Sequence, residues 1–582
     1  MNQPRMRISG IRRALRCWRI AGPLIALLGL AACGGGGNTA PVSTSPTSPT
    51  PPTTPPTTPS VAAADAARLL DQATFGVTAS DIAHVQSIGI DAYITEQIAY
   101  SPTQYTGYSY TPHTAPAGCI GDGSNPPDAA SLCARAQYSP FQVQRDFFTH
   151  ALNNPDQLRQ RVAFALSQIM VVSSVEIYEA YGLADYQNIL LNDALGNYRT
   201  LLQDVTLSPT MGHYLDMANS DETNAQNGTV PNQNYAREVL QLFSIGLVEL
   251  NPDGTQQLDA NGAPIPTFDG DTIEGFASIF TGWTYPPLSG ATSQWTNPIN
   301  FDGTMVAFPN HHEPGTKLLL NGYTVPAGQT PAQDLANALD DIFNHPNVGP
   351  FISQQLIQHL VTSNPSPAYV ARVAAIFANN GQGVRGDLSA VVRAILTDTE
   401  ARGVAPASNV FGRLREPALF ITGMLRSLGG QSDGVLLRNA SSAMGQPIFS
   451  PDTVFSFFPP SYQIPGTSTL APEFGIDNAA TALARANFVN TVIMQGGALP
   501  DPTVTGSTGT SINLTPLAGT SSNAVLISEL NQTLLHGSLP SDASNIILAA
   551  VNPIAAGSLD PLAAVRAASY LILTSAQYQV ER

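Results

Sequence analysis

Helical periodicity dominates the pattern of hydrophobic and polar positions from Val61 onward. Thr78 with Asp81 three residues later resembles a capping box, and Gly89 marks the stop of that helix. Asn154 followed by Pro155 predicts a further helix start, because Asn caps helices and Pro is favoured at the first helical position. Apolar side chains then follow at helical spacing: Leu158, Val162, Leu166, Ile169 and Met170. Later helices are expected after a cap at Asp271, over 332–343, 348–361, 367–379, 387–400 and 411–428, near Asn478, and over 562–573.

One stretch departs from the helical pattern. Residues 250–268 contain the turn dipeptides Asp253-Gly254 and Asn261-Gly262 between short extended pieces, which predicts one or two β-hairpins. Residues 440–475 and 503–522 are rich in turn formers and are expected to be irregular. The predicted fold is therefore mainly α, a multi-helix globular body with a small β-hairpin element near 250–268.

The helix expected after Asn232 carries the first candidate chemistry. Tyr235, Val239, Leu242 and Phe243 form its apolar stripe, and Gly246 ends it. Glu238 falls at the edge of that stripe, where a carboxylate needs an ionic or hydrogen-bond partner, while Arg237 points to the polar side. Asn232, Asn234 and Glu238 either line a polar pocket or cap the helix and bridge to a neighbour.

The first 60 residues predict export and lipid anchoring. Residues 1–19 are basic, and Ile20–Ala32 is an uncharged apolar run of 13 residues. That run is too short to span a bilayer, so residues 1–32 are interpreted as a signal peptide. Leu30-Ala31-Ala32-Cys33 is typical of a lipobox, with Cys33 as the lipidated residue. Residues 33–60 form a Gly-, Pro-, Thr- and Ser-rich linker, and 61–582 form the body.

The charge and the cysteines of the chain indicate which partners and which cellular compartment to expect. The chain has 25 basic and 42 acidic residues, a formal charge of −17, and loss of the signal peptide with its six arginines leaves about −23. Such an acidic surface repels phosphate backbones, so no nucleic-acid partner is expected. Cys119 and Cys133 are expected to form a disulfide in an oxidising compartment. Since Gly34 follows the lipidated cysteine, we expect an outer-membrane location with the membrane as partner through the lipid.

Several ordered motifs resemble one family. They are Arg68-Leu69-Leu70-Asp71-Gln72-Ala73-Thr74-Phe75-Gly76, Asn232-Gln233-Asn234-Tyr235-Ala236-Arg237-Glu238, Phe280-Thr281-Gly282-Trp283, His312-Glu313-Pro314-Gly315-Thr316-Lys317, Met444-Gly445-Gln446-Pro447 and Tyr570-Leu571-Ile572-Leu573. Over residues 61–580 the chain resembles the exported bacterial family called domain of unknown function 1800. The resemblance implies a mainly helical fold and no assigned activity. It also suggests an exported partner of the family called domain of unknown function 1501 (DUF 1501), which resembles alkaline phosphatases.

The chain departs from that family's pattern at two positions. Gln233 stands where Glu is common, and Glu313 stands where the family has Asp after His312. Both changes alter carboxylates, so a carboxylate role at these positions is in doubt.

The segment from His311 to Lys317 is the second candidate site. His311, His312 and Glu313 could move protons, and Lys317 is the only lysine of the chain. No zincin motif is present, because Pro314 breaks the required helix and no His follows Glu313 at the required spacing, so no metal is predicted. The segment is either a polar site or a structural loop. If it is a site, Glu238, His312 and Lys317 should come together near the start of the 233–245 helix.

Trp283 is expected close to that site, either as a binding surface or as a core plug. The sequence contains no phosphate-binding loop, dinucleotide fingerprint or CxxC motif, and no cofactor is predicted. Two functions remain open. The first is an envelope lipoprotein that acts as a binding or assembly module. The alternative is an exported hydrolase or lyase acting on an envelope or extracellular polymer, with Glu238, His312 and Lys317 as acid, base and charge stabiliser.

Overall fold

A computed structural model describes residues 61–124, 126–226, 228–403 and 410–582. The chain divides into two units, Met1–Thr58 and Pro59–Arg582, and the described residues belong to the second. The expected signal peptide, Cys33 and the linker over 33–60 lie outside the described residues.

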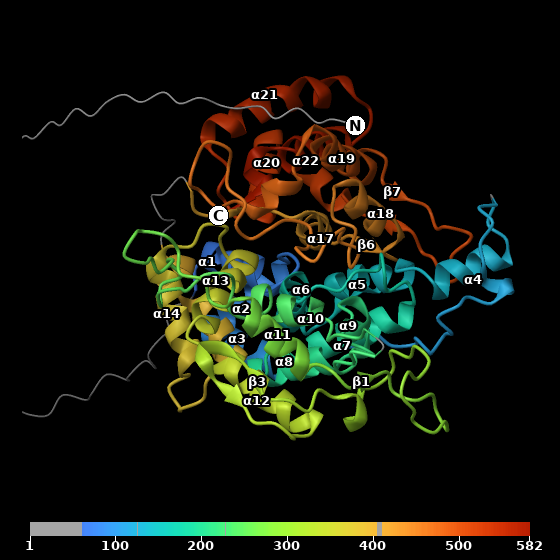
Figure 1. Cartoon of the computed structure of the whole chain (residues 1–582). Helices are drawn as coiled ribbons and strands as arrows, with labels where there is room; N and C mark the ends of the chain where they lie inside the picture. The colour runs from blue at the N-terminus through green and yellow to red at the C-terminus, as the bar shows by residue number, and fades with distance from the viewer. Residues whose placement is uncertain (1–60, 125, 227, 404–409) are drawn as a thin grey trace, which may run out of the picture. The chain divides into compact units, whose positions relative to one another are not determined.

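Helices make up most of the described body, as the sequence predicted (Figure 1). The first half contains α1 (Ala63–Ala73), α2 (Ala79–Ile88), α3 (Ile90–Ala99), η1 (Ala117–Cys119), α4 (Ala129–Gln137), α5 (Phe141–Asn153), α6 (Gln157–Ile169), α7 (Ala180–Asp193), α8 (Tyr198–Leu207), α9 (Pro209–Tyr214), α10 (Asn234–Gln241) and α11 (Gly270–Ile279).

The second half continues with further helices and helical turns. They are η2 (Pro309–His311), η3 (Leu320–Gly322), α12 (Pro331–Asn344), α13 (Val348–Leu360), α14 (Pro367–Ala378), α15 (Leu388–Thr397), α16 (Thr399–Arg402), α17 (Pro417–Ser427), α18 (Val435–Ala443), η4 (Pro472–Ile476), α19 (Ala479–Val489), η5 (Asn490–Met494), η6 (Thr515–Gly519), α20 (Asn523–Leu535), α21 (Ser541–Gly557), α22 (Ala563–Leu573) and α23 (Ala576–Gln579).

The strands are two residues long and form small antiparallel sheets. The pairs are β1 (Trp283–Thr284) with β2 (Val306–Ala307), β3 (Lys317–Leu318) with β4 (Thr324–Val325), and β5 (Arg413–Leu414) with β9 (Val580–Glu581), while β8 (Thr510–Ser511) lies between β6 (Gln431–Ser432) and β7 (Gly497–Ala498). Each sheet fastens loops or chain ends to the helical body and does not form a layer of its own.

One hydrophobic core runs through the body, from Ala66 in α1 to Tyr578 in α23. Both ends of the body therefore contribute to the same core. The C-terminal helices α20, α21 and α22 pack on one another, and α17 contacts both α20 and α5 (Figure 1). The pairing of Arg413 with Glu581 between β5 and β9 adds a second attachment of the C-terminus.

Several predicted boundaries hold. Thr78 caps α2 by accepting a hydrogen bond from the Asp81 amide, and Gly89 ends the helix. The helices expected over 332–343, 348–361 and 367–379 begin and end within one residue of α12, α13 and α14. Hydrophobic periodicity was sufficient to place these helices because each of them buries one continuous apolar face.

Other boundaries were wrong for local reasons. Asn154 ends α5 and does not cap α6, which begins two residues after Pro155 with Asp156 at its N-cap. Asp269, not Asp271, caps α11 through the Thr272 amide. The helix expected over 411–428 begins only at Pro417, because residues 413–414 pair with the C-terminus as β5. No range was predicted for helices α4, α5, α7, α8, α9, α18, α20 and α21.

The expected hairpin near 250–268 is present as short antiparallel bridges. Val248 faces Pro266, Leu250 faces Gln256, and Leu258 faces Pro264. Gly254 and Gly262 have φ values of 79° and 81°, so each turn uses the left-handed backbone that favours glycine. The two predicted turn dipeptides therefore do form the turns of this segment.

The expected disulfide between Cys119 and Cys133 is confirmed, with the two Cα atoms 4.9 Å apart. It joins η1 to α4 across a 14-residue separation. Because α4 buries none of its side chains fully, the bridge supplies a constraint that packing does not.

Candidate functional site

The segment after His311 forms a buried ionic cluster. Lys317 Nζ lies 2.6 Å from Asp334 Oδ2, and His312 Nε2 lies 2.9 Å from the same oxygen. Lys317 also donates to the backbone carbonyl of Glu313. Burial acts to raise the pKa of Asp334, but the hydrogen bonds and charges of His312 and Lys317 hold it below its usual value. These three side chains are almost completely excluded from solvent.

The surroundings of His312 show how the fold fixes this cluster. His312 Nδ1 lies 3.0 Å from the backbone oxygen of Thr281, which is an acceptor. Since Nε2 faces the Asp334 carboxylate, each ring nitrogen lies within hydrogen-bond distance of an oxygen acceptor. The hydroxyl of Thr281 accepts from the Glu313 amide. A Cβ at Gly282, where φ is 80°, would lie 3.0 Å from the His312 side chain. These contacts hold the segment 280–283 directly against the segment 312–317.

Glu238 does not join this cluster. Within the described residues its carboxylate forms no ion pair, and its Oε2 is buried without a hydrogen-bond partner. Burial raises the pKa of Glu238, and the nearby charge of Arg237 acts against that rise. The structure therefore brings together two of the three expected residues, through Asp334, while Glu238 is not among their partners. The expectation that Glu238 must be paired was wrong.

The other candidate residues at the start of α10 form local hydrogen bonds at the helix end. Asn232 is exposed and its side chain accepts from the Asn234 amide. Gln233, not Asn232, occupies the N-cap position of α10. Asn234 Nδ2 donates to Asp216 at 3.2 Å, and Arg237 is exposed as expected. These contacts fit the interpretation of helix capping and bridging better than a pocket.

His311, Glu313 and Trp283 are held in separate contacts. The ring of His311 stacks on Trp295 with a centroid distance of 4.0 Å, and its Nδ1 lies 3.0 Å from Asp221. Glu313 Oε2 accepts from the Thr223 amide. Trp283 is 5% exposed in β1, and its indole nitrogen is buried without a partner among the described residues. Its position is that of a core residue.

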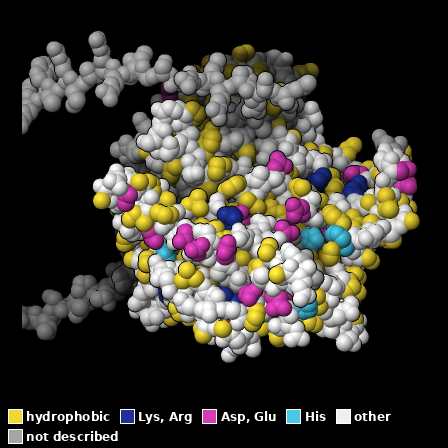
Figure 2. All heavy atoms as spheres, viewed as in Figure 1, with side chains coloured by type: hydrophobic (Ala, Val, Ile, Leu, Met, Phe, Trp, Pro, Cys, Tyr) yellow, Lys and Arg dark blue, Asp and Glu magenta, His cyan; other side chains and the backbone are white. Residues whose placement is uncertain are grey.

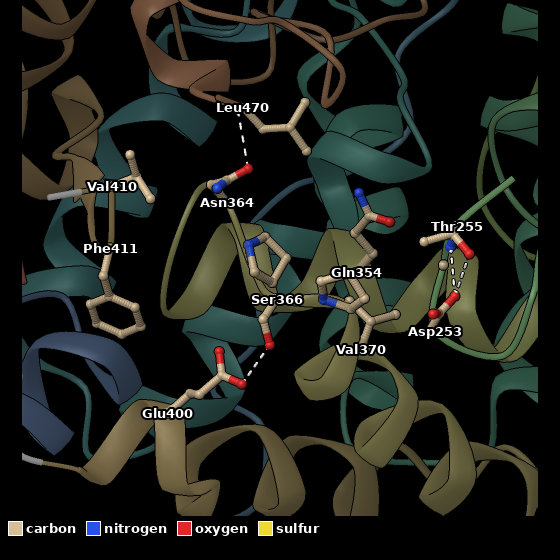
Figure 3. A pocket seen from close by; sticks show the side chains of 13 residues that line it. Asp253, Thr255, Gln354, Asn364, Ser366, Val370, Glu400, Val410, Phe411 and Leu470 are labelled. Atoms are coloured by element: carbon tan, nitrogen blue, oxygen red, sulfur yellow. Dashed lines mark hydrogen bonds between the residues drawn. The ribbon is translucent and has the colours of Figure 1, made fainter. Parts of the chain in front are cut away.

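A cavity of about 410 Å³ lies elsewhere, between the hairpin and helices α13 and α14 (Figure 3). Figure 3 shows the turn with Asp253 and Thr255 on one side, Val410 and Phe411 on the other, and Gln354 between them. The wall is completed by Gly254, Asn364, Pro365, Ser366, Pro367, Val370, Glu400 and Leu470. Thr255, Pro367 and Val410 are exposed, so the cavity opens to solvent.

Two side-chain amides offer hydrogen bonds to a molecule in this cavity. The amide of Gln354 bonds to none of the residues that the structure describes, and Gly254 packs against it so closely that a Cβ would lie 3.0 Å from its Oε1. The Oδ1 of Asn364 accepts from the Leu470 amide at 3.2 Å, which leaves its NH₂ group for a ligand. An amide carries both donors and an acceptor, so each can serve a hydroxyl group.

The charged groups of the cavity are already engaged. Glu400 accepts from the Ser366 hydroxyl at 2.5 Å and from Arg372 Nη2 at 3.0 Å. Asp253 accepts from the hydroxyl and amide of Thr255. None of the lining residues is basic. The wall therefore disfavours anions and contains no pair of free groups for acid–base chemistry.

Sequence reasoning found one edge of this cavity and missed the rest. The Asp253-Gly254 turn and the start of α14 at Pro367 were both predicted, but as local structure. Gln354 and Asn364 lie on and after α13, and no motif distinguishes them from other polar residues at helical spacing. Their convergence depends on how the hairpin packs against α13, which is a tertiary contact.

Within the ranges described, no helix has the length and apolar character needed to cross a membrane. No group of three or more His, Cys, Asp and Glu side chains among those same residues is arranged to hold a metal ion.

Comparison with known families gives one match. The family described as "Protein of unknown function (DUF1800)" matches residues 68–580. This range covers almost all of the body, so the chain belongs to that family. No curated protein and no solved structure matches.

Proposed function

We propose that this member of the family is a binding module of the bacterial cell envelope that takes a segment of neutral saccharide polymer into the cavity between the hairpin, α13 and α14. The observation that carries the proposal is the open cavity of about 410 Å³, whose wall includes Gln354 with a side-chain amide that bonds to none of the described residues. Ligand sites commonly combine such a volume with apolar walls and a few placed polar groups.

The lining matches the two faces of a sugar ring. The hydroxyls of a saccharide are donors and acceptors at once, as are the amides of Gln354 and Asn364. Phe411 and Leu470, which are partly exposed, offer apolar surface for the C–H face of the ring. Since Asp253 and Glu400 are the ionisable groups of the wall, an anionic polymer would meet repulsion without a compensating cation.

Binding is favoured over catalysis for the residues singled out by the sequence. His312 and Lys317 are buried and both contact the carboxylate of Asp334, so a substrate has no access to them. Glu238 contributes no partner to that cluster. A hydrolase or lyase built on these three residues therefore has no cleft in which to work.

The proposal includes the location of the module. The lipobox at Leu30–Cys33 would tether the body to a membrane, and the linker over 33–60 would let it reach a polymer some distance away. A tethered receptor gains effective concentration toward a polymer fixed in the same envelope, so weak single-site affinity suffices.

A binding screen tests the proposal. The full chain in detergent micelles is incubated with immobilised neutral glucans, mannans and xylans, with anionic alginate, and with uncharged peptides. Retention by a neutral polysaccharide and not by alginate is expected. Retention by alginate or peptides alone contradicts the saccharide assignment.

A further inference from the structure

The helix α21 is apolar on two sides, although it packs on the body through only one of them. It buries Ile547 and Val551, and it contacts α20 and α22. Figure 1 shows α21 at the outer edge of the C-terminal helices, with α20 and α22 between it and the rest of the body. A helix that is apolar all round is normally covered on every side. The outward side of α21 is therefore unlike that of an ordinary solvent-facing helix.

The outward side carries a continuous row of apolar residues. Ile546 is 70% exposed and Ile554 is 41% exposed, and Ala550 and Pro553 are exposed between them. Positions 546, 550, 553 and 554 follow one another at helical spacing, so they lie on one face of the helix. We call these four residues the apolar face. Leu559, which follows the end of the helix, is fully exposed.

Charged groups are scarce around the apolar face. No residue between Asp542 and Asp560 is ionisable. The charged residues of the wider segment 479–560 are Arg485, Asp501, Glu529, Asp542 and Asp560. Figure 2 shows most charged side chains of the drawn face over the lower part of the body, and few over the region of α19, α20 and α22. This region therefore lacks the dense acidic charge that would repel an anionic surface.

The start of α21 lies near the point where the linker enters the body. A cavity of about 220 Å³ is formed between the first turns of α1 and the end of α20. Its lining includes Ala63, Ala64, Ala67, Gln532, Thr533 and His536. His536 Nε2 also lies 3.1 Å from Asp71 Oδ2 of α1. Only residues 537–540 separate His536 from the first residue of α21, so a membrane that holds the linker is within easy reach of this helix.

The composition of the apolar face fits lipid better than protein. Protein interfaces gain most of their affinity from buried Trp, Tyr and Arg side chains, which a polar rim surrounds. The apolar face contains none of these three residue types, and Leu559 adds one more aliphatic side chain next to it. Acyl chains form no hydrogen bonds, so aliphatic side chains alone complement them.

The length of α21 limits how it can meet a bilayer. Its 17 residues span about 26 Å, with Asp542 in the first turn and Asp560 three residues after the end. A helix that crosses a membrane needs about 20 apolar residues. The buried side of α21 also holds it against α20 and α22. The helix therefore suits the membrane interface, with its axis along the surface.

We propose that the apolar face of α21 rests in the interface of the bilayer that holds the lipid on Cys33, with Leu559 inserted beside it. The inference rests on the lipid anchoring within the proposed function and adds a second contact between the protein and the membrane. The attraction is apolar, because residues 543–559 include no basic side chain. It depends neither on anionic lipids nor on salt.

Quenching by lipid tests the inference on the full chain reconstituted in phosphatidylcholine vesicles. Cys119 and Cys133 are bridged, so Ala550→Cys supplies a thiol for a fluorescent probe on the apolar face. Gln382→Cys supplies a thiol at an exposed position outside the C-terminal helices, and wild type taken through the same labelling is the blank. The probe at position 550 should shift to the blue and be quenched by lipids with brominated acyl chains, in low and in high salt. The probe at position 382 should do neither.

Matched double variants show which side chains hold the helix on the lipid. In the Ala550→Cys background, Ile546→Asn with Ile554→Asn should lower the quenching at least about threefold. Val175→Asn with Leu258→Asn, which changes two exposed apolar residues outside α21, should leave the quenching unchanged. All four side chains are exposed in the folded chain, so the unfolding temperature should shift little in either double variant.

Flotation with the vesicles separates this inference from the lipid anchor. The Ile546→Asn, Ile554→Asn variant should still float, because its lipid remains. If that variant stays in solution while wild type floats, the binding by α21 stands and the lipid anchoring fails. Wild type that does not float contradicts both.

Two results overturn the inference while the anchor stands. The first is floated wild-type background in which the probes at positions 550 and 382 are equally unquenched. The second is a blue shift at position 550 without quenching by brominated lipid, because a second protein molecule then covers the apolar face.

Discussion

Lys317 Nζ lies 2.6 Å from Asp334 Oδ2, with 1% of the lysine side chain and none of the aspartate side chain exposed. The only lysine of the chain is therefore a structural cation. A compact ammonium can approach Asp334 beside His312 and still reach the Glu313 carbonyl, a geometry that the larger guanidinium group does not fit.

Replacing this lysine should destabilise the body. Lys317→Met leaves Asp334 with His312 as its remaining partner, and loss of one member of a buried ion pair costs about 3–5 kcal/mol. Urea denaturation measures the difference. As a control, Arg566→Met removes a half-exposed ion pair with Asp560 and should cost less than about 1 kcal/mol. Equal stability of Lys317→Met and wild type would show that the buried pair contributes nothing.

Acid stability should depend on Asp71. Burial alone would raise the pKa of Asp71, but Arg415 and His536, each within 3.2 Å of Oδ2, hold that pKa below its usual value. A carboxyl group with a depressed pKa stabilises the fold above its unfolded value of about 3.9, and this contribution is lost as the pH falls through the folded value.

Asp71→Asn should therefore be less stable than wild type at neutral pH, with the gap closing as the pH falls below about 4. Urea denaturation between neutral and acid pH measures both curves. Asp542→Asn, a change at an exposed residue at the start of α21, serves as the control. Parallel curves for Asp71→Asn and wild type refute the assigned role.

The disulfide should act locally. Replacing Cys119 and Cys133 by Ser removes a constraint worth about 3 kcal/mol in the chain-entropy model. Because α4 contributes no fully buried side chain, hydrogen exchange should accelerate over η1 and α4 more than in the buried helix α6. Uniform acceleration in all helices contradicts this prediction. Mass spectrometry of the non-reduced wild type should find the two cysteines in one linked peptide pair.

Helix positions followed from the sequence because most helices bury a continuous apolar face. Predicted helix boundaries were wrong where a tertiary contact determined the local structure. Residues 413–414 pair with the chain end as β5, so periodicity alone placed the start of α17 too early. Helix α21 was missed because many of its apolar side chains, including Ile546 and Ile554, are exposed and give no clear stripe.

The candidate site was harder to predict for the same reason. The motifs of His312 and Lys317 signalled an unusual environment, but the carboxylate partner came from α12, where Asp334 resembles any helical Asp. The amides of Gln354 and Asn364 come to line one cavity only in the folded chain. Sequence motifs therefore indicated which segments contain unusual polar side chains. The partners of those side chains were determined by tertiary packing.

Lipid attachment at Cys33 remains a prediction from the lipobox. Labelling cells with radioactive palmitate should mark the wild type and leave Cys33→Ser unlabelled. The labelled protein should fractionate with the outer membrane, since Gly34 follows the cysteine. Label in the Cys33→Ser variant, or wild-type protein confined to the inner membrane, would contradict the respective parts of this prediction.

The cavity proposal is tested most directly by calorimetric titration of neutral hexasaccharides of glucose, mannose and xylose into the full chain and into Gln354→Ala. The control is Gln382→Ala, which changes an exposed glutamine outside the cavity wall. Loss of one amide that a ligand engages should weaken binding about 10-fold. The account predicts binding of at least one neutral hexasaccharide by wild type and Gln382→Ala, with that loss in Gln354→Ala. Equal affinity for all three proteins, or no binding by any, would contradict it.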